Sequence, residues 1–260
     1  MRTLFRWFVT YILPPLGAFF TVVILWHFAT VIFDIKRYIL PGPLLVAEAG
    51  VKNLGELWNG FLMTGAEAIV GFAASLCVGT LVACLFSQSP VIRRSLFPYA
   101  IFLQTVPIVA IAPLIVIWFG TGFQSVVLVS FIISLFPIIT NATAGLLQVD
   151  PDLLDLFRLN NATRWQTLLK LRLPSAVPSI ITGARIASGV AVIGAIVGEF
   201  FAGYVSRKGL GYLILQTAPQ LKTDKLFATV IASTILGLTI FALVSLIGNL
   251  ILNRWYDGEA

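Results

Sequence analysis

Six apolar runs, each long enough to cross a lipid bilayer, limit the fold of this sequence more than any other feature. A helix needs about 20 apolar residues to span roughly 30 Å of hydrocarbon. Because 58% of the 260 residues are hydrophobic and only 11% are charged, a soluble domain could not bury the apolar surface. We therefore predict an all-α polytopic membrane protein with six transmembrane helices, near Tyr11 to Phe33, Gly60 to Phe86, Phe97 to Phe119, Phe123 to Leu147, Pro178 to Ala202 and Leu226 to Leu252.

The charges that flank these runs predict the orientation. Arg2 and Arg6 precede the first run, which is too long for the apolar part of a signal peptide and shows no clear cleavage site. We expect an uncleaved first span that starts in the cytoplasm. An even number of spans then places both termini there, and this side also holds the larger share of the 17 Lys and Arg residues.

Several function classes lack the residues they need. The net charge is +6, but no basic tail or repeat of aromatic and basic residues indicates nucleic-acid binding. His27 is the only histidine, and Cys77 and Cys84 lie about 10 Å apart on one helix, beyond disulfide reach. We find no catalytic residues and no metal or cofactor site. No phosphate-binding Gly-x-x-x-x-Gly-Lys-Ser/Thr loop occurs, so any ATP must be bound by another chain.

Polar residues inside the apolar runs are candidates for a translocation path. Gln104, Thr105 and Asn141 need a partner or water at membrane depth, although hydrogen bonds between helices would serve as well. Prolines must break or kink the third span, which we expect to face the protein interior. These prolines are Pro98, Pro107 and Pro113, and Pro107 is a further candidate to line the path.

Two carboxylates lie within predicted spans, Glu67 and Glu199. A charge inside a membrane is costly enough to suggest a role. Both residues lie near external ends, within two turns of the surface, where we expect them to reach water. Glu199 is a candidate to cap or gate the external mouth of the path.

Small residues at four-residue spacing mark two of the predicted spans. Such stripes let helix backbones approach closely in lipid. We therefore predict tight packing at Gly71, Ser75, Gly79 and Ala83 in the second span, and at Gly194, Gly198 and Ala202 in the fifth.

The longest polar stretch, Gln148 to Leu173, reads as two short helices. From Asp150 it runs DPDLLDLFRLNNATRWQTLLKLRLPSAVPSIITGARIA. This segment resembles the EAA loop of ABC import permeases, in which Glu-Ala-Ala, Gly and Leu-Pro recur at fixed spacing. Asp155, Leu156 and Phe157 stand at the Glu-Ala-Ala positions, Asn161 at the Gly, and Leu173-Pro174 at the end. The spacing agrees fully, whereas Leu156 and Phe157 depart from the two alanines.

Local chemistry within this loop supports two helices. Asn161 can take the left-handed conformation that ends a helix, as the second choice after Gly. Ala162-Thr163-Arg164-Trp165 then resembles the opening of the family's next helix, with Thr163 as a candidate N-cap. We expect Pro174 and Pro178 to end that helix and to begin the fifth span.

Over residues 60 to 250 the sequence also resembles one group of permeases, those for nitrate, sulfonate, taurine, bicarbonate and thiamine precursors. This resemblance is carried by Gln104-Thr105-Val106-Pro107, Ala112-Pro113-Leu114, Trp118-Phe119-Gly120, Gly198-Glu199-Phe200 and Gly209-Leu210-Gly211-Tyr212. The resemblance implies the type I ABC importer fold. It divides the chain into an N-terminal helix with an external segment (1–59), a permease domain (60–252) with a cytoplasmic coupling loop (148–174), and a cytoplasmic tail (253–260).

The same resemblance implies a function and partners. The chain would be a permease subunit in a bacterial cytoplasmic (inner) membrane, paired with a second copy as a homodimer, two cytoplasmic ATPases and an external substrate-binding protein. Residues 155–157, 161–165 and 173–174 would contact the ATPase, with Asp155, Arg164 and Trp165 foremost. An ATP-independent secondary transporter or channel is the alternative, and six spans without a visible inverted repeat argue against it. The substrate stays open between small anions and a thiamine-precursor pyrimidine.

Overall fold

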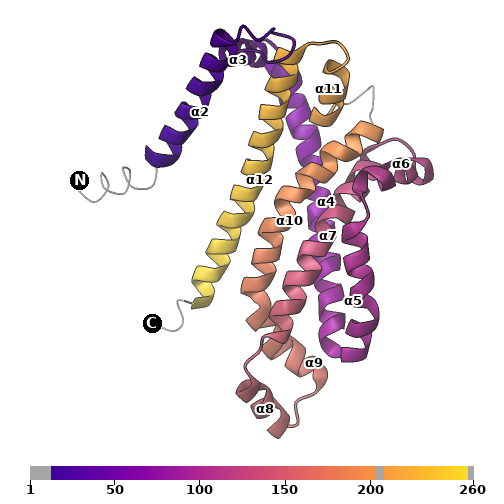
Figure 1. Ribbon diagram of the computed structural model, residues 1–260. Helices are drawn as coiled ribbons and strands as arrows, with labels where there is room; N and C mark the ends of the chain where they lie inside the picture. Colours follow the sequence, from indigo (N-terminus) through magenta and orange to yellow (C-terminus); the bar gives the residue numbers. More distant parts are fainter. Residues whose placement is uncertain (1–12, 203–207, 257–260) are drawn as a thin grey trace. The chain divides into compact units, whose positions relative to one another are not determined.

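The computed structural model describes residues 13–202 and 208–256, and Figure 1 traces the chain through them. Arg2, Arg6, Arg207 and residues 257–260 of the predicted tail lie outside the described residues. The helices are α2 (Leu13–Ile32), α3 (Pro43–Lys52), α4 (Leu54–Gln88), α5 (Pro90–Thr105), α6 (Ile108–Phe119), α7 (Phe123–Leu147), α8 (Pro151–Leu159), α9 (Arg164–Thr167), the π-helical segment η2 (Leu168–Arg172), α10 (Leu173–Ala202), α11 (Leu210–Thr217) and α12 (Thr223–Tyr256).

The all-α prediction with six spans is confirmed. In the described part of the chain, five helices are long and apolar enough to cross a membrane, and the number is six if the bent pair α5 and α6 is counted as one span. The two halves of this pair meet at 96°. The bend falls at Val106, which is extended, and at Pro107, which precedes α6. Of the three prolines, Pro107 therefore breaks the span, whereas Pro98 and Pro113 lie inside helices.

The described residues form two compact units, and the smaller contains residues 13–57 and 213–231. Polar side chains tie its segments together. Arg37 donates to Asp224 over 2.8 Å, and Lys225 donates to Glu56 over 2.6 Å. The rings of Trp26 and Phe227 stack with centroids 5.9 Å apart. The domain boundary expected at residue 59 stays a prediction.

The larger unit contains the described residues 58–202, 208–212 and 232–256, and it is built around the pairing of α7 with α10. Small residues let the two backbones approach. A methyl group on Gly194 would lie 2.8 Å from the Ser130 Cα atom, and one on Gly198 would lie 3.0 Å from the Val126 Cα atom. The Ser130 hydroxyl donates to the Ala191 carbonyl over 2.9 Å. The small-residue stripe predicted in the fifth span is thus confirmed as a packing surface.

Helix α4 also packs against α7, through the stripe predicted in the second span. A methyl group on Gly71 would lie 2.6 Å from the Ser130 hydroxyl oxygen, and one on Gly79 would lie 2.8 Å from a methyl group of Ile138. Between them, the hydroxyls of Ser75 and Ser134 form a hydrogen bond of 3.0 Å. This stripe is also confirmed.

One expectation about the fifth span is wrong. Pro174 and Pro178 do not end the preceding helix, because α9, η2 and α10 follow one another from Arg164 to Ala202 without a break. The π-helical turn bonds residue i to i+5 and so shifts the backbone pattern just before Pro174, which has no N–H to donate. Pro178 lies inside α10. The polar loop therefore passes into the membrane span as continuous helix.

Candidate functional site

The loop between α7 and α10 is organised by caps at each helix end. Asp150 begins α8, and its side chain accepts a hydrogen bond of 2.9 Å from the Asp152 backbone N–H. Within α8, Arg158 donates to Asp155 over 2.8 Å, with both side chains exposed. At the predicted acidic position of the loop, Asp155 thus holds an adjacent cation rather than a backbone group.

The turn after α8 has the conformation expected from the sequence. Asn161 has a φ angle of +51°, in the left-handed region. Its N–H donates to the Arg158 carbonyl over 3.0 Å, and the Ala162 N–H donates to the Phe157 carbonyl over 2.9 Å. This pair of bonds is the Schellman arrangement that closes a helix C-terminus.

The next helix begins with a complete capping box. The Thr163 hydroxyl accepts from the Gln166 N–H over 3.2 Å, and the Thr163 N–H donates to the Gln166 side chain over 2.7 Å. Thr163 is therefore the N-cap, as predicted. The reciprocal bonds hold the start of the helix that continues into α10.

Apolar side chains on this loop remain exposed. Leu159 is 81% exposed and Trp165 66% exposed, and Leu153 and Leu156 on α8 are also open. Phe157 is half-buried. Apolar side chains exposed on so short a helix are not stabilised by burial within this chain. The exposed face is therefore suited to binding a partner.

The loop is held to the bundle at its far end. Leu168 and Leu171 of η2 are buried, and Leu168 packs in a cluster with Ala83, Ala142, Leu146 and Ala176. Arg172 donates to the backbone carbonyl of Ser87, near the end of α4. This link is not predictable from the sequence, because nothing in the spacing of Ser87 and Arg172 indicates a contact over 85 residues.

The residues predicted to line a path lie on different helices. Gln104 and Thr105 lie exposed at the end of α5, where Thr105 bonds its own helix through the Phe102 carbonyl, 2.9 Å away. Pro107 caps α6. Asn141 is half-buried on α7 and donates to the Pro137 carbonyl over 2.8 Å.

Glu199 holds the start of α11 instead of facing water. Its carboxylate accepts from the Thr64 hydroxyl over 2.6 Å and from the backbone N–H groups of Gly211 and Tyr212. Thr64 in turn accepts from the Leu210 N–H over 2.8 Å. We call this set of four residues and Glu199 the α11 latch. It joins the end of α10 to α4 and to the first turn of α11.

The expectation that both span carboxylates reach water is wrong, since Glu67 is 0% and Glu199 2% exposed. Glu67 faces Glu199, yet neither of its oxygens has a hydrogen-bond partner of good geometry among the described residues. Helix packing covers both groups more deeply than their sequence positions indicate. Gly209 and Gly211 allow the burial of Glu199, because a side chain at either position would overlap the Glu199 carboxylate. The two glycines that follow Glu199 in the sequence were the signal from which its burial could have been predicted.

An all-α bundle of apolar spans, with a capped polar loop that runs directly into one of them, defines a multi-pass membrane protein. Comparison with known families makes the assignment specific. The model of the binding-protein-dependent transport system inner membrane component matches residues 75–257, and the chain belongs to this family.

Relatives and a solved structure agree with this assignment. The chain is 31% identical to the formylaminopyrimidine transport permease protein ThiX of Halalkalibacterium halodurans, over 92% of this chain and 95% of that one. It is 32% identical to the riboflavin transport system permease protein RibX of Chloroflexus aurantiacus, over 93% and 91%. The crystal structure of an amino acid ABC transporter with histidines shares the fold, with a TM-score of 0.60 at 20% identity over 78% of this chain and 96% of that one.

The chain is therefore an ABC importer permease subunit for a small solute in the inner membrane, and the ATP-independent alternative is set aside. Family membership implies an ATPase, a substrate-binding protein and a dimeric arrangement of permeases. Relatives of this kind are transport subunits rather than enzymes.

Proposed function

We propose that two copies of this chain form the translocation path of an ATP-driven importer, and that residues 148–174 couple each copy to one of two separate ATPases. The N- and C-termini and this loop lie in the cytoplasm. Residues 1–59 supply an additional span and an external segment to a permease domain of residues 60–252.

One observation carries the coupling proposal: exposed apolar side chains lie on α8 and at the start of the uninterrupted helix that follows its capped turn. Leu156, Leu159 and Trp165 need a groove to cover them. Helix continues from Arg164 to Ala202, so a force applied to the loop reaches the span without a flexible joint. A partner that binds this face can thereby favour one state of the permease over another.

Within the loop, the proposed contacts have different tasks. Leu156, Phe157 and Trp165 present apolar surface to the ATPase groove, and Asp155 and Arg164 border it with opposite charges. Residues Asn161, Ala162 and Thr163 shape the turn that aims α8, and Leu173-Pro174 begin α10. The loop is a mechanical link and carries out no chemistry.

We infer that the solute is small and polar or anionic, of the nitrate, sulfonate, taurine or thiamine-precursor pyrimidine kind. Two relatives are named for formylaminopyrimidine and riboflavin transport, which favours a heteroaromatic ring with hydrogen-bonding groups. The external binding protein would select it. Gln104, Thr105, Pro107 and Asn141 border the path, and Glu199 shapes its external end through the α11 latch.

The coupling proposal is tested by replacing the exposed tryptophan of the loop. Trp165→Ala in the assembled transporter should weaken ATPase binding about 30-fold, because a central aromatic contact contributes about 2 kcal/mol or more. Trp118→Ala is the matched control, since Trp118 on α6 is 68% exposed and lies outside the loop. Equal ATPase affinity in the two variants would refute the proposed contact.

Orientation is tested by labelling. A cysteine placed at Leu159, with Cys77 and Cys84 replaced by serine, should react with a membrane-impermeant maleimide in inverted vesicles but not in right-side-out vesicles. The reverse pattern would place the loop outside the cell and overturn the proposal.

A further inference from the structure

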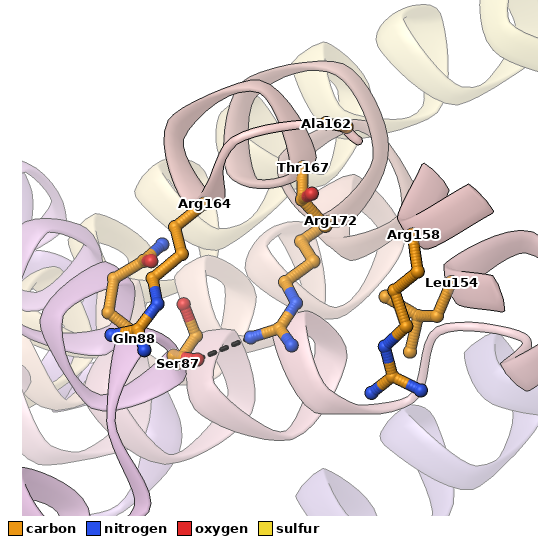
Figure 2. Close-up of a pocket in the computed structure, with 8 residues that line it drawn as sticks. All are labelled: Ser87, Gln88, Leu154, Arg158, Ala162, Arg164, Thr167 and Arg172. Atoms are coloured by element: carbon orange, nitrogen blue, oxygen red, sulfur yellow. Dashed lines mark hydrogen bonds between the residues drawn. The ribbon is translucent and has the colours of Figure 1, made fainter. Parts of the chain in front are cut away.

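A cavity of about 380 Å³ opens between the end of α4 and the α8–η2 loop. Figure 2 shows side chains from three segments turned toward it. The polar residues that line it are Ser87, Gln88, Arg158, Arg164, Thr167 and Arg172. Its volume lies within the range of about 300–1,000 Å³ typical of small-ligand sites.

The cavity is strongly cationic. Arg158, Arg164 and Arg172 line it, and no carboxylate does. Asp155 pairs with Arg158, but Arg164 has no ion pair among the described residues. Arg172 donates to the Ser87 carbonyl, leaves further N–H groups free, and is repelled by the guanidinium of Arg158. A bound anion would relieve this repulsion.

The donors reach the cavity from different sides. In Figure 2 the side chains of Arg164 and Gln88 appear on one side of the view, Arg172 in the centre, and Arg158 on the opposite side. A planar carboxylate is held by one guanidinium fork, whereas a tetrahedral phosphoryl group can accept from several forks at once. We propose that this cavity is a binding site for a phosphate group, either an anionic phospholipid headgroup or inorganic phosphate.

The position of the cavity fits both sources. Ser87 and Gln88 are the last residues of the 35-residue span helix α4, so a headgroup at the membrane surface can reach the arginines. The cavity is also open to dissolved phosphate. In either case the anion would bridge α8 and η2 to α4 and hold the loop to the bundle. The site shares Arg164 with the edge of the face proposed for the ATPase. Anion binding by the permease is nevertheless testable without the ATPase.

The experiment measures lipid retention by the full-length permease alone. Purified protein is placed in detergent micelles containing equal amounts of phosphatidylglycerol and phosphatidylcholine, and native mass spectrometry determines which lipid stays bound. Wild-type protein should retain phosphatidylglycerol preferentially. The double variant Arg158→Gln, Arg164→Gln should weaken this retention by at least tenfold, since each lost guanidinium removes a charge-assisted hydrogen bond.

A second double variant controls for net charge. Arg94→Gln, Arg254→Gln removes the same charge at residues outside the cavity and should retain the lipid as wild type does. Arg172→Lys keeps the charge but removes the fork, and should weaken retention while preserving the fold. Titration with inorganic phosphate separates the sources: displacement of the lipid indicates a general phosphate site, and persistence indicates a headgroup site.

The proposal is overturned if the two double variants retain equal amounts of phosphatidylglycerol and neither differs from wild type in phosphate binding. It is also overturned if Arg158→Gln, Arg164→Gln lowers only the affinity for the ATPase. In that case the cavity receives an acidic side chain of the partner. Loss of ATPase binding in Trp165→Ala with lipid retention intact would show that the two proposals succeed or fail separately.

Discussion

The Thr64 hydroxyl is the group on which the α11 latch depends most, because it takes part in two of its hydrogen bonds. It donates to Glu199 over 2.6 Å and accepts from the Leu210 N–H over 2.8 Å, and the side chain is fully buried. Thr64→Val keeps the shape but removes both bonds. Losing a donor to a carboxylate costs about 1.5–3 kcal/mol, and an unpaired buried N–H about 1–3 kcal/mol. We expect a total of about 3 kcal/mol or more.

Hydrogen exchange of the α11 amides measures this change directly. Because 1.4 kcal/mol corresponds to a factor of ten, the Leu210 and Gly211 amides should exchange about a hundredfold faster in Thr64→Val than in wild type. Thr64→Ser, which keeps the hydroxyl, should restore most of the protection. Thr182→Val is the control, because the Thr182 hydroxyl is exposed and bonds only its own helix at Pro178.

The reasoning fails if Thr64→Val leaves exchange at Leu210 unchanged, or if Thr182→Val accelerates it equally. Either result would mean that backbone packing alone holds α11. Exchange that rises across the whole of the larger unit would instead indicate global destabilisation, so amides of α7 serve as an internal reference.

Further predictions concern packing and the loop. Gly194→Ala should destabilise the α7–α10 pair by about 2 kcal/mol, seen as a smaller folded fraction in size-exclusion chromatography, whereas Gly189→Ala, where nothing lies within 4 Å of an added methyl group, should not. Asn161→Gly should leave α8 intact and Asn161→Val should weaken it by about 1 kcal/mol, measured by proteolysis of the loop, because the φ angle is +51°. Thr163→Ala should likewise cost about 1 kcal/mol by loss of the capping box, and equal proteolysis in wild type and variant would contradict this.

Features that depend on local chemistry were predictable from the sequence. Apolar run length indicated the spans, because lipid requires a continuous hydrogen-bonded helix. Asn161 and Thr163 indicated the turn and the N-cap, since each acts within a few residues of itself. The stripes at Gly71 and Gly194 indicated tight packing but not the partner helix, which is α7 for both stripes.

Features that depend on contacts distant in sequence were not predictable. Glu199 was expected to be accessible because it lies near a span end. Its sequence position does not indicate the hydrogen bond from Thr64, which lies 135 residues away. The continuity through Pro174 was missed because a proline is read as a helix end when only α-helical bonding is considered. A π-helical turn relieves the conflict between Pro174 and a continuous helix. No residue pattern in Leu168–Arg172 predicts that turn.

These two missed features lie on one helix and have a joint consequence. Helix α10 is 30 residues long, about 45 Å at 1.5 Å per residue, with η2 and the polar loop at its start and Glu199 near its end. A displacement of η2 is therefore passed along a continuous helix to the carboxylate that caps α11. Because the latch bonds are short and buried, α10 cannot rotate or slide without moving α11 or breaking those bonds. We expect motion at the loop to change the hydrogen exchange of α11, and Thr64→Val to weaken that dependence.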